Sequence, residues 1–195
     1  YRLLLVVGDH LPSTTPAALE AWVRDGGTLL ATAGAGLMDS YQTPLPAMSA
    51  LLGLTERSYE EKETFLRPLQ DLPFVQPHGQ LRGADWIMPE LAVRERVKTT
   101  AEAEILAKFD DGSPAFLRRP LGQGQIFFVA SLPGVAWVWG AQQPPRVIDR
   151  SATNHVVPTH FDAGAAKLID TVWQASKITP RIEIAAGGQL DARLL

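Results

Sequence analysis

Residues 2–32 alternate between short apolar runs and a segment of helical composition. The runs at 2–7 and 28–32 are apolar on both faces, a pattern typical of buried strands in a parallel sheet. Between them, residues 13–16 (Ser-Thr-Thr-Pro) predict a helix start with a hydroxyl cap and proline in the first turn, and the glycines at 26–27 predict its end. The pattern predicts a strand–helix–strand unit with two parallel strands.

The clearest strand pattern lies in residues 103–131. Three short runs of strand-forming residues are separated by the turn sequences Asp-Asp-Gly-Ser at 110–113 and Leu-Gly-Gln-Gly at 121–124. Tight turns of this composition join antiparallel neighbours. We therefore predict an antiparallel meander, and its last run, at 126–130, is apolar enough to lie at the centre of a sheet.

The remaining segments give weaker patterns. Residues 44–54 predict a short helix closed by Gly53, and residues 55–100, with charge clusters and several prolines, predict short strands and loops. After Asp162, apolar residues recur three and four positions apart, which predicts a helix with Asp162 as its cap.

Residues 132–161 predict a long irregular stretch rich in proline and tryptophan, including Trp137 and Trp139. Long loops in compact domains tend to be functional or to cover another surface. The stretch also holds His155 and His160, whose roles the sequence leaves open.

Composition narrows the possible functions. The chain has 195 residues, of which 46% are hydrophobic and 20% charged, as in a globular domain. With a net charge of −3, the chain does not have the excess of positive charge that is typical of nucleic-acid-binding proteins. No run of residues approaches the ~18 apolar residues of a membrane span. The absence of cysteine excludes disulfides, thiolate metal sites and a cysteine nucleophile. We expect no metal and no cofactor, and the compartment stays open.

The two ends of the chain indicate a piece of a larger protein. Tyr1 leads directly into the first apolar run, without an initiator methionine or a cleavage signal, and residues 181–184 look like the start of a strand. We expect one domain over 1–178, followed at 179–195 by a linker or the start of another domain.

Two blocks of sequence resemble a known family. Residues 26–32 (Gly-Gly-Thr-Leu-Leu-Ala-Thr), followed by Gly36 and Asp39, resemble one conserved stretch of the beta-galactosidase trimerisation domain. Residues 109–115, followed by Gly-Gln-Gly-Gln-Ile at 122–126, resemble its meander. That domain belongs to the class I glutamine amidotransferase-like superfamily, and the resemblance covers about residues 1–175.

The resemblance implies a fold and a role. The fold would be an α/β, flavodoxin-like three-layer sandwich with a mostly parallel sheet and the meander at 103–131, lacking the family's first strand and helix before Tyr1. Enzymes of the superfamily carry a cysteine on a glycine-flanked turn, and the equivalent turn here is Ala33-Gly34-Ala35-Gly36. Without a thiol it cannot form an acyl intermediate. The resemblance therefore implies a non-catalytic module for oligomerisation or domain assembly within a larger carbohydrate-associated protein, such as a glycoside hydrolase.

A ligand cleft is the alternative. Asp9, His10, Asp39 and Tyr41 follow two strands that we expect to be neighbours, and ligands of open α/β sheets gather at the carboxyl ends of strands. With Gly34 these residues could bind a small ligand or serve a hydrolase. The structural interpretation, which we favour, is a local turn at Asp9, an exposed His10 and a helix cap at Asp39.

The tryptophans have three interpretations. Trp137 and Trp139, with Tyr41, could form an aromatic platform for sugars. The two tryptophans could instead anchor a subunit interface, where such residues are enriched, or belong to the core. The sequence leaves these three open. A possible interface at Trp137 and Trp139 would have self-association or other domains of the parent chain as its partners, and we expect no nucleic acid or membrane.

Overall fold

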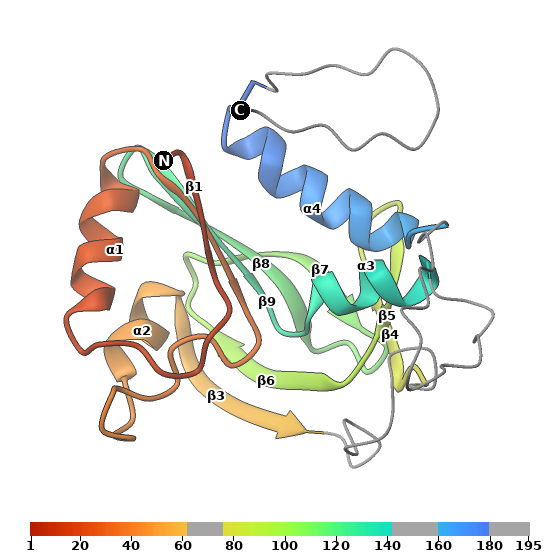
Figure 1. The fold of residues 1–195 in the computed structure, drawn as a ribbon, viewed down its shortest axis with the longest axis horizontal. Coiled ribbons are helices and arrows are strands. Elements are labelled where there is room, and N and C mark those ends of the chain that lie inside the picture. Colours follow the sequence, from red (N-terminus) through yellow and green to blue (C-terminus); the bar gives the residue numbers. More distant parts are fainter. Residues whose placement is uncertain (62–75, 142–159, 180–195) are drawn as a thin grey trace, which may run out of the picture.

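The computed structural model describes residues 1–61, 76–141 and 160–179, and everything below refers to these ranges. Most of the regular structure is β (Figure 1). The strands are β1 (Leu3–Val6), β2 (Thr28–Thr32), β3 (Leu54–Glu61), β4 (Gly79–Arg82), β5 (Ile87–Glu90), β6 (Val93–Thr99), β7 (Glu104–Phe109), β8 (Pro114–Leu121) and β9 (Gly124–Val129).

Seven strands form one curled, mixed sheet in the order β1-β2-β9-β8-β7-β4-β5 (Figure 1). β1, β2 and β9 run parallel to one another, with Leu29 of β2 opposite Leu4 on one side and Ile126 on the other. β9, β8 and β7 are joined by the two predicted turns and pair antiparallel. The predicted strand–helix–strand unit and the meander at 103–131 are therefore both present.

The prediction of a flavodoxin-like three-layer sandwich is wrong. Only two strand pairs of the large sheet are parallel, and the other four are antiparallel, so the sheet is not mostly parallel. Four of the strands lie between Leu54 and Thr99, in the region where short strands and loops were expected over residues 55–100. Two of these strands extend the curled sheet into a half-barrel, and β3 and β6 pair antiparallel as a separate two-stranded sheet, which we call the ribbon.

The helices are α1 (Thr15–Arg24), α2 (Pro46–Leu51), α3 (Pro133–Ala141) and α4 (Ala163–Ala175). α1 has Pro16 in its first turn, but Thr14 makes no side-chain capping bond, so the predicted hydroxyl cap is wrong. α4 begins as predicted, because the Asp162 carboxylate accepts a 2.7 Å hydrogen bond from the Ala165 amide. None of the helices within the described ranges is long and apolar enough to cross a bilayer.

The region 132–161 differs from its prediction where it is described. Residues 133–141 are helical rather than irregular, because a proline at the first position and a run of apolar residues suit a short helix packed on a sheet. Residues 142–159 of the predicted stretch, with His155, lie outside the described residues, as does the predicted strand at 181–184.

The core lies between the large sheet and its covering elements. All of β2 is buried, as are residues 126–129 of β9, and the rings of Phe116 and Phe127 stack 5.7 Å apart. Where α1 ends, the chain passes very close to the start of β9. A Cβ on Gly124 would lie 2.2 Å from the carbonyl oxygens of both Val23 and Gly27. Only glycine fits there, which explains the Gly-Gln-Gly turn.

Candidate functional site

The predicted nucleophile turn follows β2 and is closed by the ribbon. Gly34 and Gly36 have positive φ angles of 85° and 60°, which favour glycine, and Ala33 and Ala35 are buried. The Gly34 amide donates a 2.8 Å hydrogen bond to Oε2 of Glu95, on β6. An amide that could have stabilised an oxyanion therefore already holds a carboxylate of the same chain.

Arg57, on β3, completes this arrangement. Its guanidinium pairs with both carboxylate oxygens of Glu95, through Nε to Oε1 and through Nη2 to Oε2 at 3.1 Å. Its Nη1 donates a 3.0 Å hydrogen bond to the Ala35 carbonyl. The Arg57 side chain is only 4% exposed and the Glu95 side chain 0%. Burial of two charges is costly unless their hydrogen-bonding groups have partners. Here the backbone of the turn provides two of those partners, the Gly34 amide and the Ala35 carbonyl.

Aromatic side chains enclose the pair. The ring of Phe128, on β9, lies 5.5 Å from the guanidinium carbon of Arg57. On the ribbon side, Tyr59 covers Gly34 so closely that a Cβ there would lie 3.0 Å from a ring carbon. The ribbon thus occupies the carboxyl ends of β2 and β9, the position where open α/β sheets bind their ligands.

The loops that carry Asp9, His10 and Asp39 run side by side, as their strands predict. The Met38 amide donates to the Asp9 carbonyl at 2.9 Å, and Met38 forms a parallel bridge with His10. The Asp9 carboxylate accepts a 2.8 Å hydrogen bond from Nδ1 of His10, an exposed contact that lowers the pKa of Asp9. The two side chains are therefore engaged with each other.

Asp39 is used locally. Its carboxylate accepts hydrogen bonds from the amides of Tyr41, at 2.8 Å, and Thr43, at 2.9 Å. It stabilises a turn rather than a helix start, so the predicted helix cap is wrong. Tyr41 is 88% exposed. In the described part of the chain, no group of three or more histidine, aspartate or glutamate side chains is arranged to hold a metal.

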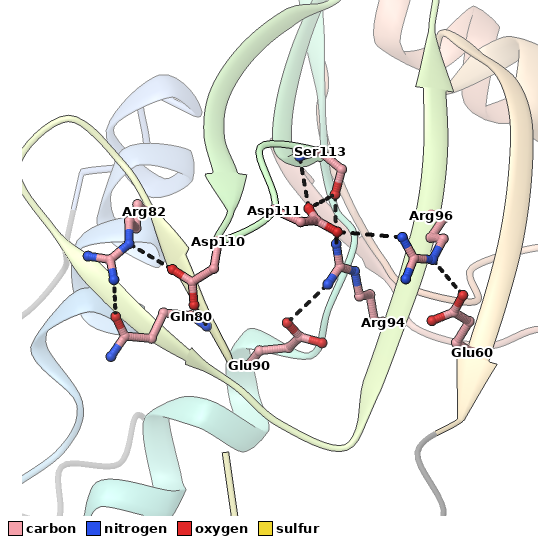
Figure 2. Close-up of polar contacts among 9 residues, drawn as sticks. All are labelled: Glu60, Gln80, Arg82, Glu90, Arg94, Arg96, Asp110, Asp111 and Ser113. Carbon is pink, nitrogen blue, oxygen red and sulfur yellow. Dashed lines mark hydrogen bonds and ion pairs between the residues drawn. The ribbon is translucent and has the colours of Figure 1, made fainter. Parts of the chain in front are cut away.

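A second polar cluster, which the sequence analysis missed, surrounds the turn between β7 and β8 (Figure 2). Arg94, on β6, pairs with Asp111, donates to Ser113 Oγ at 2.7 Å and lies 3.6 Å from Glu90. The guanidinium carbon of Arg94 lies 4.1 Å from the Phe109 ring centroid. Hydrogen bonds from the hydroxyl and amide of Ser113, and then from Arg94, hold the pKa of Asp111 well below its usual range.

The same cluster reaches β3 and β4. Arg96 donates to Glu60 at 2.6 Å, which raises the pKa of Arg96, and lies 3.5 Å from Asp111. On the other side of the turn, Arg82 donates to Asp110 at 2.8 Å (Figure 2). The turn at 110–113, predicted only as a connection, is thus the place where the ribbon and the large sheet share charged contacts.

The two tryptophans of α3 differ in environment. The Trp137 and Phe161 rings lie 4.7 Å apart, with 38% and 40% of each residue exposed. Trp139 is partly buried and packs against the core. Nearby, His160 has a positive φ of 63°, and its carbonyl lies against Gly140 of the same helix. Of the predicted interface pair, only Trp137 therefore presents substantial aromatic surface.

Comparison with known proteins gives a family and a fold. Residues 4–143 match the family described as the beta-galactosidase trimerisation domain. No individually curated protein sequence matches the chain. A beta-galactosidase from the Antarctic haloarchaeon Halorubrum lacusprofundi is similar in structure, with a TM-score of 0.60 and 16% identity over 91% of this chain and 22% of that chain.

Two further beta-galactosidase structures share the fold. A catalytic mutant of Gan42B, a GH42 enzyme from G. stearothermophilus, has a TM-score of 0.53 and 18% identity over 68% of this chain and 19% of that chain. The enzyme from Bacillus circulans sp. alkalophilus has the same TM-score and identity over 67% of this chain and 20% of that chain. The chain thus spans about a fifth of the length of these structures. It belongs to the beta-galactosidase trimerisation domain family, whose members are non-catalytic assembly modules.

Proposed function

We propose that this chain joins copies of a larger glycoside hydrolase, and that the exposed side of α3 contributes to the contact between copies. The observation that carries the second part is the aromatic pair of Trp137 and Phe161, two large rings that contact each other at an interplanar angle of 30° and yet remain more than one third exposed. Aromatic residues are enriched at the energetic centres of protein interfaces.

The composition of α3 supports this assignment. From Pro133 to Ala141 the helix has no charged side chain and no polar one other than the indole nitrogens of its tryptophans. A helix that is apolar on all sides is normally buried on all sides. Three of its residues face the core, whereas Trp137 lies on the uncovered side. A second copy is the partner that the family's trimerisation role supplies.

The symmetry of a trimer restricts how this surface is used. A closed ring of three copies requires head-to-tail contacts, in which one surface of each copy meets a different surface of the next. The side of α3 would therefore pack against another face of the neighbouring copy, not against its own counterpart. Loss of one of the two surfaces would be enough to prevent ring closure.

The test is the mass of the assembly in solution. We expect Trp137→Glu, in the full-length parent, to convert the trimer to monomers in light scattering coupled to size exclusion, because a buried unpaired carboxylate is strongly unfavourable at an interface. Ile105→Glu is the matched control, since Ile105 is a similarly exposed apolar residue, at 40%, on β7 rather than on α3. A Trp137→Glu variant that is folded by circular dichroism and still trimeric would contradict this role for α3.

We also propose limits for this domain and a wider kinship for its fold. The end of α4 at Ala175 supports a domain boundary near residue 178, with 179–195 as a linker or the start of a following domain. Kinship with the class I glutamine amidotransferase-like superfamily is supported by the strand–helix–strand unit and the glycine turn at 33–36 alone. The catalytic groups of the parent would lie in another of its domains.

A further inference from the structure

The turn at 33–36 presents two backbone groups of opposite polarity to the ribbon. The Gly34 amide donates to the ribbon, and the Ala35 carbonyl accepts from it. The other amides of the turn bond to main-chain carbonyls: Ala33 to Ser131, Ala35 to Thr32 and Gly36 to Gly8. Buried backbone groups need partners, so the Gly34 amide requires an acceptor and the Ala35 carbonyl requires a donor from outside the main chain.

Glu95 and Arg57 meet this requirement in one orientation only. Glu95 Oε2 accepts from both the Gly34 amide and Arg57 Nη2, and Glu95 Oε1 accepts from Arg57 Nε. The bidentate guanidinium–carboxylate geometry is among the strongest pairings that side chains make. It fixes the carboxylate against the amide and leaves Arg57 Nη1 to reach the Ala35 carbonyl.

We propose that the turn at 33–36 is a carboxylate receptor and that the chain supplies its own ligand, the side chain of Glu95, which docks the ribbon onto the large sheet. Backbone contact supports the docking, because the Glu95 amide donates to the Ala130 carbonyl at 2.9 Å. The inference goes beyond self-association, since it concerns how one copy holds its own ribbon.

Two hydroxyl groups in residues next to the turn are consistent with a polar binding site there. Thr32 and Ser131 are both more than nine-tenths buried, and their hydroxyls make no hydrogen bond within the described ranges. Thr32 ends β2 directly before the turn, and the Ser131 carbonyl accepts from the Ala33 amide. Two buried hydroxyls therefore belong to residues that directly precede the turn or bond to its backbone.

The receptor is tested by removing its ligand. Glu95→Ala deletes the carboxylate and leaves space beside the Gly34 amide and the Arg57 guanidinium. If formate binds there with a dissociation constant on the order of 10 mM, 100 mM sodium formate raises the melting temperature of Glu95→Ala by about 4 °C. Sodium chloride at equal ionic strength should not. Wild type and Glu56→Ala, which removes an exposed ribbon carboxylate, should show no formate-specific rise.

Both folding outcomes of Glu95→Ala are informative. If the variant is folded, equal melting temperatures in formate and chloride would overturn the receptor. If it is unfolded in buffer, formate should restore its folded circular dichroism spectrum, and failure to do so would overturn the receptor equally. Each comparison of formate with chloride is made on the same variant at the same protein concentration, so it is distinct from the assembly mass that tests the proposed function.

A charge exchange separates a receptor from a simple ion pair. The double variant R57E/E95R keeps the pair but reverses it, which places a cation against the Gly34 amide and an anion against the Ala35 carbonyl. We expect R57E/E95R to melt no higher than the less stable of R57E and E95R. Recovery to within about 3 °C of wild type, the scale of a ~1 kcal/mol effect, would mean that the backbone of the turn plays no part.

Discussion

The ribbon is held to the large sheet by two groups of charged side chains that differ in burial. The Arg57–Glu95 pair is almost wholly buried and bonds to the backbone of a turn. In the cluster around Asp111 the carboxylate itself is open to solvent, with 43% of the Asp111 side chain exposed, although only 10% of the side chain of its partner Arg94 is exposed. Both are built from arginine and carboxylate, so the difference lies in their surroundings. The buried pair provides partners for backbone groups that would otherwise be unsatisfied, whereas exposed charges contribute little to folding stability and are screened by salt.

The largest expected effect comes from breaking the buried pair. Arg57→Met leaves the Glu95 carboxylate buried without its cation, which costs about 3–5 kcal/mol of unfolding free energy. Urea unfolding followed by tryptophan fluorescence would measure it. Arg118→Met is the control, because Arg118 is 44% exposed and pairs with Glu104 on the surface. Equal urea midpoints for Arg57→Met and Arg118→Met would contradict the claim that the buried pair stabilises the protein more than the exposed pair does.

A smaller loss is expected when both charges are replaced together. The double variant R57M/E95L removes the desolvation cost of the pair but leaves the Gly34 amide and the Ala35 carbonyl without partners. Unsatisfied buried groups cost about 1–3 kcal/mol each, so we expect the double variant to lie below wild type and above Arg57→Met in unfolding free energy. Buried pairs elsewhere are often replaced without loss. A double variant as stable as wild type would show that the turn does not depend on the pair.

The smallest effect concerns Asp111 and has a pH signature. Because its pKa is depressed in the folded state, the Asp111 carboxylate stabilises the protein above its unfolded-state pKa of about 3.9, and this contribution is lost as the pH falls through the folded-state value. After solvent screening we expect Asp111→Asn to cost about 1 kcal/mol at pH 7.

The melting temperature is the readout for this variant. The gap between wild type and Asp111→Asn should be constant from pH 8 to 5 and shrink below about pH 4. The control Asp85→Asn alters a carboxylate that is 68% exposed and pairs with Lys167 on the surface. It should show a small gap throughout. A gap for Asp111→Asn that widens at acid pH would contradict the sign of the shift.

Local pattern predicted the parts of the fold that depend on local chemistry. A few neighbouring residues were enough to predict each of these elements: the strands in the apolar runs at 2–7 and 28–32, the turns of the meander and the helix cap at Asp162. The ribbon was missed because its outward positions carry charges such as Glu56 and Lys98, which pair across the strands and hide the apolar alternation. The prediction of a flavodoxin-like architecture was wrong for a related reason, because a few parallel strands do not determine how the other strands of a sheet pair.

The buried pair could be foreseen only in part. Glu95 stands at an inward position between Val93 and Val97, so the period of two in β6 marks it as facing the core. Arg57 has no such signal, because its neighbours on β3 are polar. That the two meet at Gly34 depends on the placement of the ribbon over β2 and β9, which is a tertiary property. The sequence placed Asp9 beside Asp39 correctly and favoured a local role for each carboxylate, but it could not identify the groups that each one bonds.

The closed turn also limits how this domain can be engineered. A thiol introduced by Ala35→Cys would stand between two glycines, as a nucleophile should, but Ala35 has no exposed surface and Tyr59 lies over the adjacent residue. The Gly34 amide would remain bonded to Glu95. Converting this domain into a hydrolase would therefore require a redesigned β3–β6 pair that opens an entrance for substrate, and no single substitution at the turn could achieve it.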